Sequence, residues 1–296
     1  MTTLLLTIAS LVLAAPLALY PAYTGARAWS RERSVVRDAA GIRAGAQAFT
    51  LGEGEVTLLM VHGFASSPAV FQRMAPALAE RGYRCRVMRL PGFGEWPGSP
   101  NFSLASWRAA LDAEVQAARA SSREVWLVGH SMGGTLALDH VLRGGAVEGV
   151  VLVTPLIQVS DKRSILLPPR QWFDLGQRLW PEAALIETAF PVDIHDPLPG
   201  LDEKRDLYLP VVAYREMFAA VDHITGRADA VPCPVLMAVA PRDLVVDSLA
   251  ATAYFADLAV EQKELLVMPE SGHVLPMDRG WRELVGAVDS FVQRRE

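Results

Sequence analysis

The decapeptide VWLVGHSMGG, residues 125–134, joins an apolar run to a helix-like stretch through a glycine-rich turn. Val125–Val128 has the continuous apolar character of a strand that is buried on both faces. Gly129, Ser131 and Gly133 then form a G-x-S-x-G pattern, in which a Cβ at either glycine would collide with a neighbouring strand or helix. The pattern therefore predicts a strand, a sharp turn that exposes a serine hydroxyl, and a helix.

The same alternation of apolar runs and helix-like stretches continues on both sides of this turn. Further strands are expected at Val56–Val61, Arg84–Leu90, Gly149–Val153, Val235–Ala240 and Glu264–Met268. Helices are expected at Ala69–Arg81, Leu104–Ala120, Gly134–Leu142 and Ser248–Leu258. Strands that alternate with helices indicate an α/β fold, with a mostly parallel central sheet and flanking helices.

One stretch, residues 155–230, interrupts the alternation. It has helix-like pieces at 171–179 and 208–220 and no convincing strand, so we interpret it as a helical cap inserted over the carboxyl edge of the sheet. Ordinary outer helices with long loops are the alternative. In the cap interpretation, residues 54–154 and 231–296 form the core, and Trp172, Trp180 and Phe218 line an apolar pocket above Ser131.

A serine hydroxyl needs a base to act as a nucleophile, and that base needs an acid to fix its tautomer. Of the six histidines, His273 lies in a glycine-containing loop directly after the last expected strand, where its imidazole would reach Ser131. Asp243 follows the strand Val235–Ala240 and lies at the same sheet edge. Asp247 is the alternative acid. The chain order serine, acid, histidine is typical of one hydrolase architecture.

An oxyanion formed at Ser131 would need backbone donors nearby. The N–H of Met132, directly after the serine, is one candidate, and the N–H of Phe64 in the turn after Val56–Val61 is the other. The remaining residues of the two turns are expected to support this geometry; they are His62, Gly63, Gly129, His130 and Gly133.

These motifs together resemble the α/β-hydrolase superfamily, and in particular its carboxylesterase and monoacylglycerol-lipase-like members. The resemblance rests on HGF (62–64), GHSMGG (129–134), PRDLVV (241–246) and SGHVLPMD (271–278). It implies a Ser-His-Asp triad, an acyl-enzyme intermediate, no cofactor, and a helical cap after the sixth strand. A hydrolase or acyltransferase acting on thioester, amide, peroxide or C–C substrates would share these residues. A non-catalytic binding protein on the same scaffold is a further alternative.

The amino terminus is distinct from the rest of the chain. Residues 1–26 contain no charged side chain, and the apolar run 4–23 is about 30 Å long as a helix, enough to span one bilayer. The segment 27–53 is expected to be a basic linker, and five arginines between residues 27 and 43 favour a cytoplasmic position for the hydrolase core behind it. A retained membrane anchor is the preferred interpretation, and a cleaved signal peptide that exports the enzyme is the alternative.

The composition of the chain disfavours several other classes of protein. A formal net charge of −5 gives no positive field for binding nucleic acid, and 51% hydrophobic residues exclude a disordered chain. Cys85 and Cys233 are expected to be buried free thiols, and no cluster of histidines or cysteines suggests a metal site. The acidic stretch 193–196 is interpreted as a solvated loop. The oligomeric state does not follow from the sequence.

Overall fold

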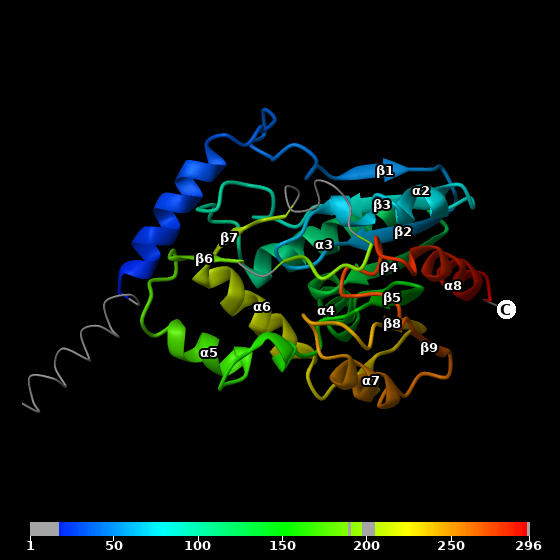
Figure 1. The fold of residues 1–296 in the computed structure, drawn as a ribbon. Coiled ribbons are helices and arrows are strands. Elements are labelled where there is room, and N and C mark those ends of the chain that lie inside the picture. The colour runs from blue at the N-terminus through cyan, green and yellow to red at the C-terminus, as the bar shows by residue number, and fades with distance from the viewer. Residues whose placement is uncertain (1–17, 189–190, 197–204, 295–296) are drawn as a thin grey trace, which may run out of the picture.

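The computed structural model describes residues 18–188, 191–196 and 205–294, and its central feature is a seven-stranded sheet (Figure 1). The strands lie in the order β1-β3-β2-β4-β5-β8-β9. β1 pairs antiparallel with β3, and every other neighbouring pair in this sheet is parallel. The bounds are β1 Phe49–Leu51, β2 Val56–Val61, β3 Arg84–Met88, β4 Glu124–His130, β5 Gly149–Val153, β8 Val235–Val239 and β9 Lys263–Val267. The mostly parallel sheet is as predicted, although the short edge strand β1 is not among the predicted strands.

Helices cover both faces of the sheet. On one face lie α3 (Leu104–Arg119), α4 (Met132–Leu142), α6 (Val211–Ile224) and α7 (Ser248–Ala256). On the other face lie the 3₁₀ turn η1 (Pro68–Phe71), α2 (Met74–Ala79) and α8 (Trp281–Gln293). The single helix expected over 69–81 is therefore two short elements, η1 and α2, and α8 is an addition to the predicted set.

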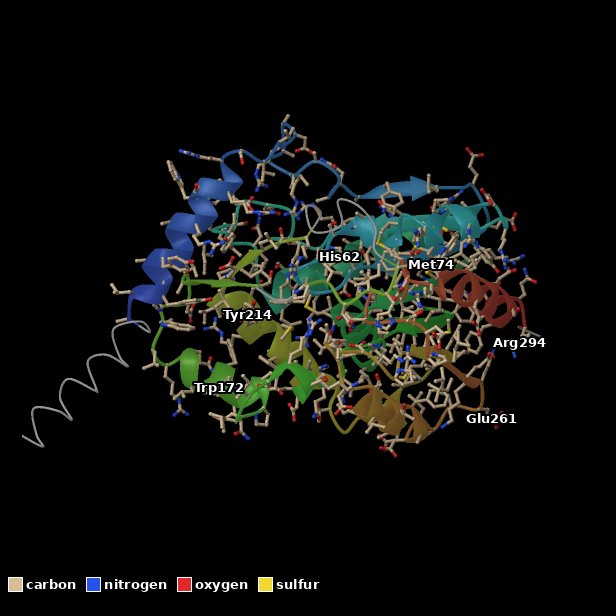
Figure 2. The ribbon with its side chains drawn as sticks, in the orientation of Figure 1. His62, Met74, Trp172, Tyr214, Glu261 and Arg294 are labelled. Atoms are coloured by element: carbon tan, nitrogen blue, oxygen red, sulfur yellow. The ribbon has the colours of Figure 1, made fainter. Side chains whose placement is uncertain are left out.

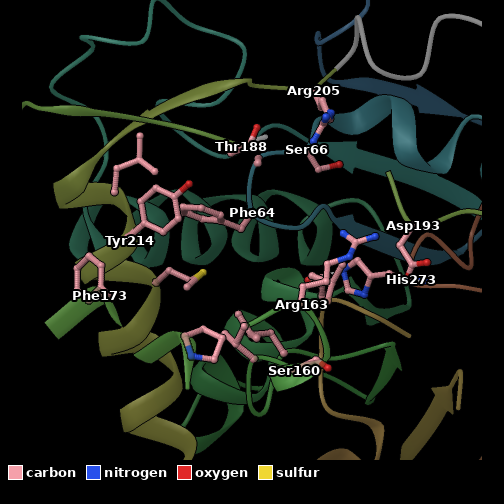
Figure 3. A pocket seen from close by; sticks show the side chains of 18 of the residues that line it. Phe64, Ser66, Ser160, Arg163, Phe173, Thr188, Asp193, Arg205, Tyr214 and His273 are labelled. Atoms are coloured by element: carbon pink, nitrogen blue, oxygen red, sulfur yellow. Dashed lines mark hydrogen bonds between the residues drawn. The ribbon is translucent and has the colours of Figure 1, made fainter. Parts of the chain in front are cut away.

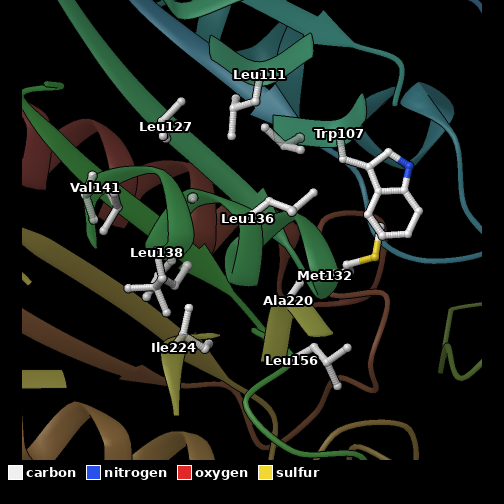
Figure 4. Close-up of a cluster of buried hydrophobic side chains, with 14 of the residues drawn as sticks. Trp107, Leu111, Leu127, Met132, Leu136, Leu138, Val141, Leu156, Ala220 and Ile224 are labelled. Carbon is white, nitrogen blue, oxygen red and sulfur yellow. The ribbon is translucent and has the colours of Figure 1, made fainter. Parts of the chain in front are cut away.

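Successive residues of the central strands point to opposite faces and enter two separate cores. Along β2, Leu59 and Val61 pack with α3 and α4, whereas Leu58 and Met60 pack with α2 and α8. Figure 4 shows the first of these cores, where side chains of α3, α4 and α6 meet. Because both faces are buried, the strand is apolar at every position from residue 58 to residue 61 instead of alternating.

The chain between β5 and β8 is the stretch interpreted as a cap, and we keep the name cap for it. It contains η2 (Asp161–Arg163), α5 (Pro169–Gly176), β6 (Leu185–Glu187), β7 (Tyr208–Pro210), α6 and η4 (Ala228–Ala230). The expectation that this stretch has no strand is wrong, because β6 and β7 pair antiparallel in a small second sheet. The resemblance implies a cap after the sixth strand, but the cap follows the fifth strand of this chain, β5, because only one strand of the described residues, β1, precedes β2. Trp172 of α5 and Tyr214 of α6 lie on the cap side of the molecule, far from Arg294 (Figure 2).

A helix over residues 18–32 packs against the cap (Figure 1). Thr24 is fully buried and donates its hydroxyl to the carbonyl of Leu185 at 2.7 Å, and Tyr20 stacks on Trp180 with ring centroids 5.0 Å apart. Most of the predicted anchor, residues 4–17, lies outside the described residues. Within the residues that the structure describes, no helix combines the length and the apolar character needed to cross a bilayer.

The segment 27–53, expected to be a linker, is attached to the rest of the fold. Arg43 and Asp206 form an ion pair at 3.0 Å in which both side chains are buried, and Asp206 also accepts the N–H of Gly94. Breaking a buried ion pair by removing one partner typically costs about 3–5 kcal/mol, because a buried charge remains. This segment therefore contacts both the cap and the loop after β3, and it ends in β1.

Candidate active site

Ser131 occupies the turn between β4 and α4. Its backbone has φ 54° and ψ −121°, a conformation that non-glycine residues rarely adopt. The turn is held on both sides, because Ser131 donates its N–H to the carbonyl of Val153 at 3.0 Å and accepts the N–H of Leu156 at 3.1 Å. The local geometry is the sharp strand-to-helix turn that the G-x-S-x-G pattern predicts.

The two glycines around the serine are required by close backbone contacts. A Cβ built on Gly129 would lie 2.3 Å from the carbonyl oxygen of Gly133, and one built on Gly133 would lie 2.0 Å from that of Val61. Both distances are too short for any side chain. The α4 helix therefore begins directly against β2, which places the serine at the carboxyl edge of the sheet.

The loops after β8 and β9 bring Asp243 and His273 to the same edge. His273 Nε2 lies 3.0 Å from Ser131 Oγ, and His273 Nδ1 lies 2.8 Å from Asp243 Oδ2. Asp243 is fully buried, and Ser131 and His273 are nearly so. The structure thus joins the three residues into one hydrogen-bonded chain.

The protonation of this chain follows from its contacts. Burial acts to raise the pKa of the Asp243 carboxyl, but the charge and hydrogen bond of His273 and the N–H groups of Val246 and Val245 outweigh it. The pKa therefore lies below its usual range, and Asp243 is a carboxylate. The carboxylate accepts a hydrogen bond from the N–H at His273 Nδ1, and this tautomer leaves Nε2 unprotonated and able to take the Ser131 hydroxyl proton.

The loop of residues 62–64 lies directly against the serine. A Cβ on Gly63 would be 2.8 Å from the Cβ of Ser131, so the close approach requires glycine. Met132 is the first residue of α4, on the other side of the serine. The ring of Phe64 packs edge-on against Phe93 and Tyr214, with centroids 5.8 and 4.8 Å away. The predicted pair of backbone donors, on Phe64 and Met132, therefore comes from two segments that flank Ser131.

His62 and His130 are buried and hold these loops. His62 Nε2 accepts the N–H of Leu90 at 3.1 Å, so Nδ1 carries the proton and donates to the carbonyl of Gly63. His130 Nε2 donates to the carbonyl of His273 at 3.1 Å. Burial lowers the pKa of His62 to about 4 and that of His130 to about 3. Both rings are neutral near pH 7, and both are hydrogen-bonded to backbone groups of the loops around Ser131.

A pocket with a volume of about 810 Å³ opens above Ser131. Its lining includes Ser131 and His273 and is mainly apolar, and cap residues that line it include Trp172, Phe173, Leu175, Trp180, Tyr214 and Phe218. Figure 3 shows Tyr214 and Phe173 at one end and His273 at the other. The volume is within the range of about 300–1,000 Å³ that is typical of small-molecule sites.

Two acidic residues accept backbone N–H groups in the structure. Asp247, the alternative acid, caps α7 by accepting the N–H groups of Leu249 and Ala250. Asp193 is only 5% exposed, so the interpretation of 193–196 as a solvated loop is wrong for this residue. It accepts backbone N–H groups of distant residues, and no local sequence pattern signals such partners.

Other candidate sites are limited. Cys85 and Cys233 are buried thiols that take part in no disulfide. Among the described residues, no group of three or more His, Cys, Asp or Glu side chains could hold a metal ion.

Comparison with known proteins identifies relatives over most of the chain. The family profile described as "Serine aminopeptidase, S33" (Hydrolase_4) matches residues 52–280. The thermostable monoacylglycerol lipase of Bacillus sp. strain H-257 is 23% identical over 244 residues, which cover 80% of this chain and 90% of that protein. A carboxylesterase of Bacillus subtilis is 21% identical over 245 residues, which cover 80% of this chain and 92% of that protein.

Solved structures show the same fold. A soluble variant of monoglyceride lipase from Saccharomyces cerevisiae, in complex with a substrate analogue, superposes with a TM-score of 0.71. The two sequences are 16% identical, and the match covers 83% of this chain and 91% of that chain. At this identity the likeness establishes the α/β-hydrolase fold.

Proposed function

The chain belongs to the serine aminopeptidase S33 family of α/β-hydrolases, and from this premise we propose that it cleaves carboxylic esters with an apolar acyl chain. The observation that carries the proposal is the hydrogen-bonded chain from Ser131 through His273 to Asp243, placed at the floor of an apolar pocket. The relatives that are named as lipases and esterases are consistent with this chemistry.

In the proposed reaction, Ser131 Oγ attacks the ester carbonyl while His273 Nε2 takes the hydroxyl proton. The negative charge that forms on the carbonyl oxygen is bound by the N–H groups of Phe64 and Met132. His273 then gives its proton to the departing alcohol, which leaves an acyl group on Ser131. Water attacks this acyl-enzyme with the same base, and the carboxylic acid is released. Asp243 stabilises the imidazolium in both steps.

The charges in the pocket favour an ester over the free amino terminus of a peptide. A subsite for an α-ammonium group needs an available carboxylate, and the described lining contains Glu187 and Asp193. Glu187 pairs with Arg27 and accepts the Tyr208 hydroxyl, and Asp193 accepts two backbone N–H groups. Both carboxylates already have partners, so the apolar lining is the dominant recognition surface.

The test is a substrate screen with the full-length protein. We expect p-nitrophenyl esters from butyrate to palmitate, and monoacylglycerols, to be hydrolysed with kcat/KM rising from acetate to the medium chains. Aminoacyl-p-nitroanilides and acyl thioesters serve as the competing substrates. Faster turnover of either competitor, or a strict preference for acetate, would contradict the proposed substrate class.

The proposal includes attachment to a membrane through the uncharged run 4–23, with the hydrolase part on the cytoplasmic side. Cleavage of a signal peptide near residue 26, the alternative, would remove Tyr20 and Thr24 together with their contacts to the cap. These contacts support retention of the helix. Alkaline carbonate washing should leave the protein with the membranes, and a mature chain that begins near residue 27 would establish export instead.

A further inference from the structure

The short segment 191–196, which precedes β7 in the cap, passes beneath the loops that hold Asp243 and His273. Asp193 is buried there, and its Oδ2 accepts two backbone N–H groups, from Leu244 at 2.8 Å and from His273 at 3.1 Å. Its backbone carbonyl also accepts the N–H of Val274 at 3.1 Å. A single side chain thus touches the residue after Asp243 and the backbone of His273 itself.

No covalent bond fixes the distance between the loop that carries Asp243 and the loop that carries His273. Asp243 follows β8 and His273 follows β9, so the 2.8 Å contact between their side chains depends on how the two loops are held. Hydrogen bonds from N–H groups to a carboxylate are stronger than those to a neutral acceptor, and a buried one resists exchange with water. One oxygen that accepts from both loops therefore fixes them relative to each other.

The segment that carries Asp193 is itself fixed to the loop of His273. Asp278, fully buried, accepts the N–H groups of His195 and Asp196 in the segment and that of Gly272 in the loop. A Cβ on Gly272 would lie 2.8 Å from the carbonyl oxygen of Asp193, which shows how closely the two backbones approach. The backbone of the segment 191–196 is therefore fixed to the loop of His273, and this holds the carboxylate of Asp193 in place.

We propose that Asp193 is a positioning residue that sets the geometry of the His273–Asp243 pair from within the cap. The catalytic roles of Asp243 and His273 rest on the proposed function, whereas the positioning of their side chains by Asp193 does not depend on it. The proposal makes the catalytic geometry depend on the segment 191–196, which no catalytic motif of the sequence includes. Figure 3 shows Asp193 next to His273 at one end of the pocket.

The test compares Asp193→Ala with Asp193→Asn. The alanine variant loses both bonds, and we expect kcat to fall about 10- to 100-fold with KM within about twofold of wild type, because a misplacement of about 1 Å costs up to that factor. The asparagine variant keeps an oxygen that can accept the same two N–H groups, so it should retain at least a third of the wild-type kcat. The rate of labelling by a fluorophosphonate should follow kcat in both variants.

Asp196→Ala is the matched control. Asp196 lies in the same segment, and its half-exposed carboxylate pairs with Arg73 at 2.7 Å instead of with the N–H groups of Leu244 and His273. Its loss should leave kcat and labelling unchanged. If Asp193→Ala does not fold, Asp193→Glu replaces it, because the charge is kept while the extra methylene moves the oxygen away from both N–H groups.

A third measurement separates this proposal from the proposed function. The downfield NMR resonance of the His273 Nδ1 proton reports the bond to Asp243 without any substrate. It should shift or broaden in the alanine or glutamate variant and stay in place in the asparagine variant. A folded alanine or glutamate variant with wild-type kcat, labelling rate and resonance would overturn the positioning role. Wild-type protein that neither cleaves esters nor reacts with the fluorophosphonate would refute the function, and the resonance would still decide the role of Asp193.

Discussion

Replacing Gly133 by alanine should damage both stability and activity. The added Cβ would lie 2.0 Å from the carbonyl oxygen of Val61, whereas real Cβ atoms essentially never approach closer than 3.0 Å. The helix α4 and the strand β2 must therefore separate by about 1 Å. Strain of this kind costs about 1–3 kcal/mol, and the better helix propensity of alanine offsets no more than about 1 kcal/mol of it.

The same displacement moves Ser131 away from the loop that carries Phe64. A shift of about 1 Å at a reacting group is expected to lower kcat about 100-fold. The assay is urea unfolding together with kcat on a p-nitrophenyl ester. Gly286→Ala is the matched control, since Gly286 lies within α8 and an added Cβ there meets nothing within 4 Å. It should stabilise the protein by about 0.5–1 kcal/mol at unchanged kcat. Gly133→Ala with wild-type stability and kcat would refute the reasoning.

The remaining predictions concern the acid, the base, the cap and the amino terminus. Asp243→Asn should lower kcat by about 10⁴-fold, because His273 would adopt the wrong tautomer, and His273→Ala should lower it by at least as much. Asp247→Asn should keep near-wild-type activity in ester hydrolysis, and the opposite ranking of the two carboxylates would show that Asp247 is the acid. Phe218→Ala should raise KM for long-chain esters more than for acetate, because Phe218 lines the pocket, and equal effects on both would argue against an acyl site. Arg43→Met should lower the free energy of unfolding by about 3 kcal/mol, because it leaves the buried Asp206 without its partner. Arg123→Met removes an exposed ion pair and should change the free energy of unfolding by less than about 0.5 kcal/mol. Equal losses of the two variants in urea unfolding would contradict this difference. Deletion of residues 1–17 should release active enzyme from membranes, and a truncated protein that still sediments with them would locate the attachment elsewhere.

The parts of the fold that follow local rules could be predicted from the sequence. β2, β4, β5 and β8 are mainly apolar runs, because each is buried on both faces, and their predicted bounds agree to within two residues. The bounds of the half-exposed edge strand β9 agree equally well. Ser131 follows β4 directly, and Asp243 and His273 lie in the loops after β8 and β9. Because the carboxyl ends of parallel strands lie at the same edge of a sheet, these positions predict that the three side chains lie at one edge.

Features that depend on tertiary contacts could not be predicted in this way. β6 and β7 have three residues each, too few for a period-two pattern, and they pair across about twenty residues of chain. Arg43 and Asp206 are far apart in sequence, and each resembles an ordinary surface charge when considered alone. Asp193 shares this property, since its partners are backbone N–H groups of residues 244 and 273, which carry no side-chain signature.

The most direct test of the proposed chemistry is covalent labelling of the nucleophile. Purified full-length protein is treated with an alkyl fluorophosphonate, and the adduct is located by mass spectrometry of the digested chain. We expect one phosphonylated residue, Ser131, loss of ester hydrolysis in proportion to labelling, and neither labelling nor hydrolysis in folded Ser131→Ala. An adduct on another residue, or undiminished hydrolysis by Ser131→Ala, would contradict the account.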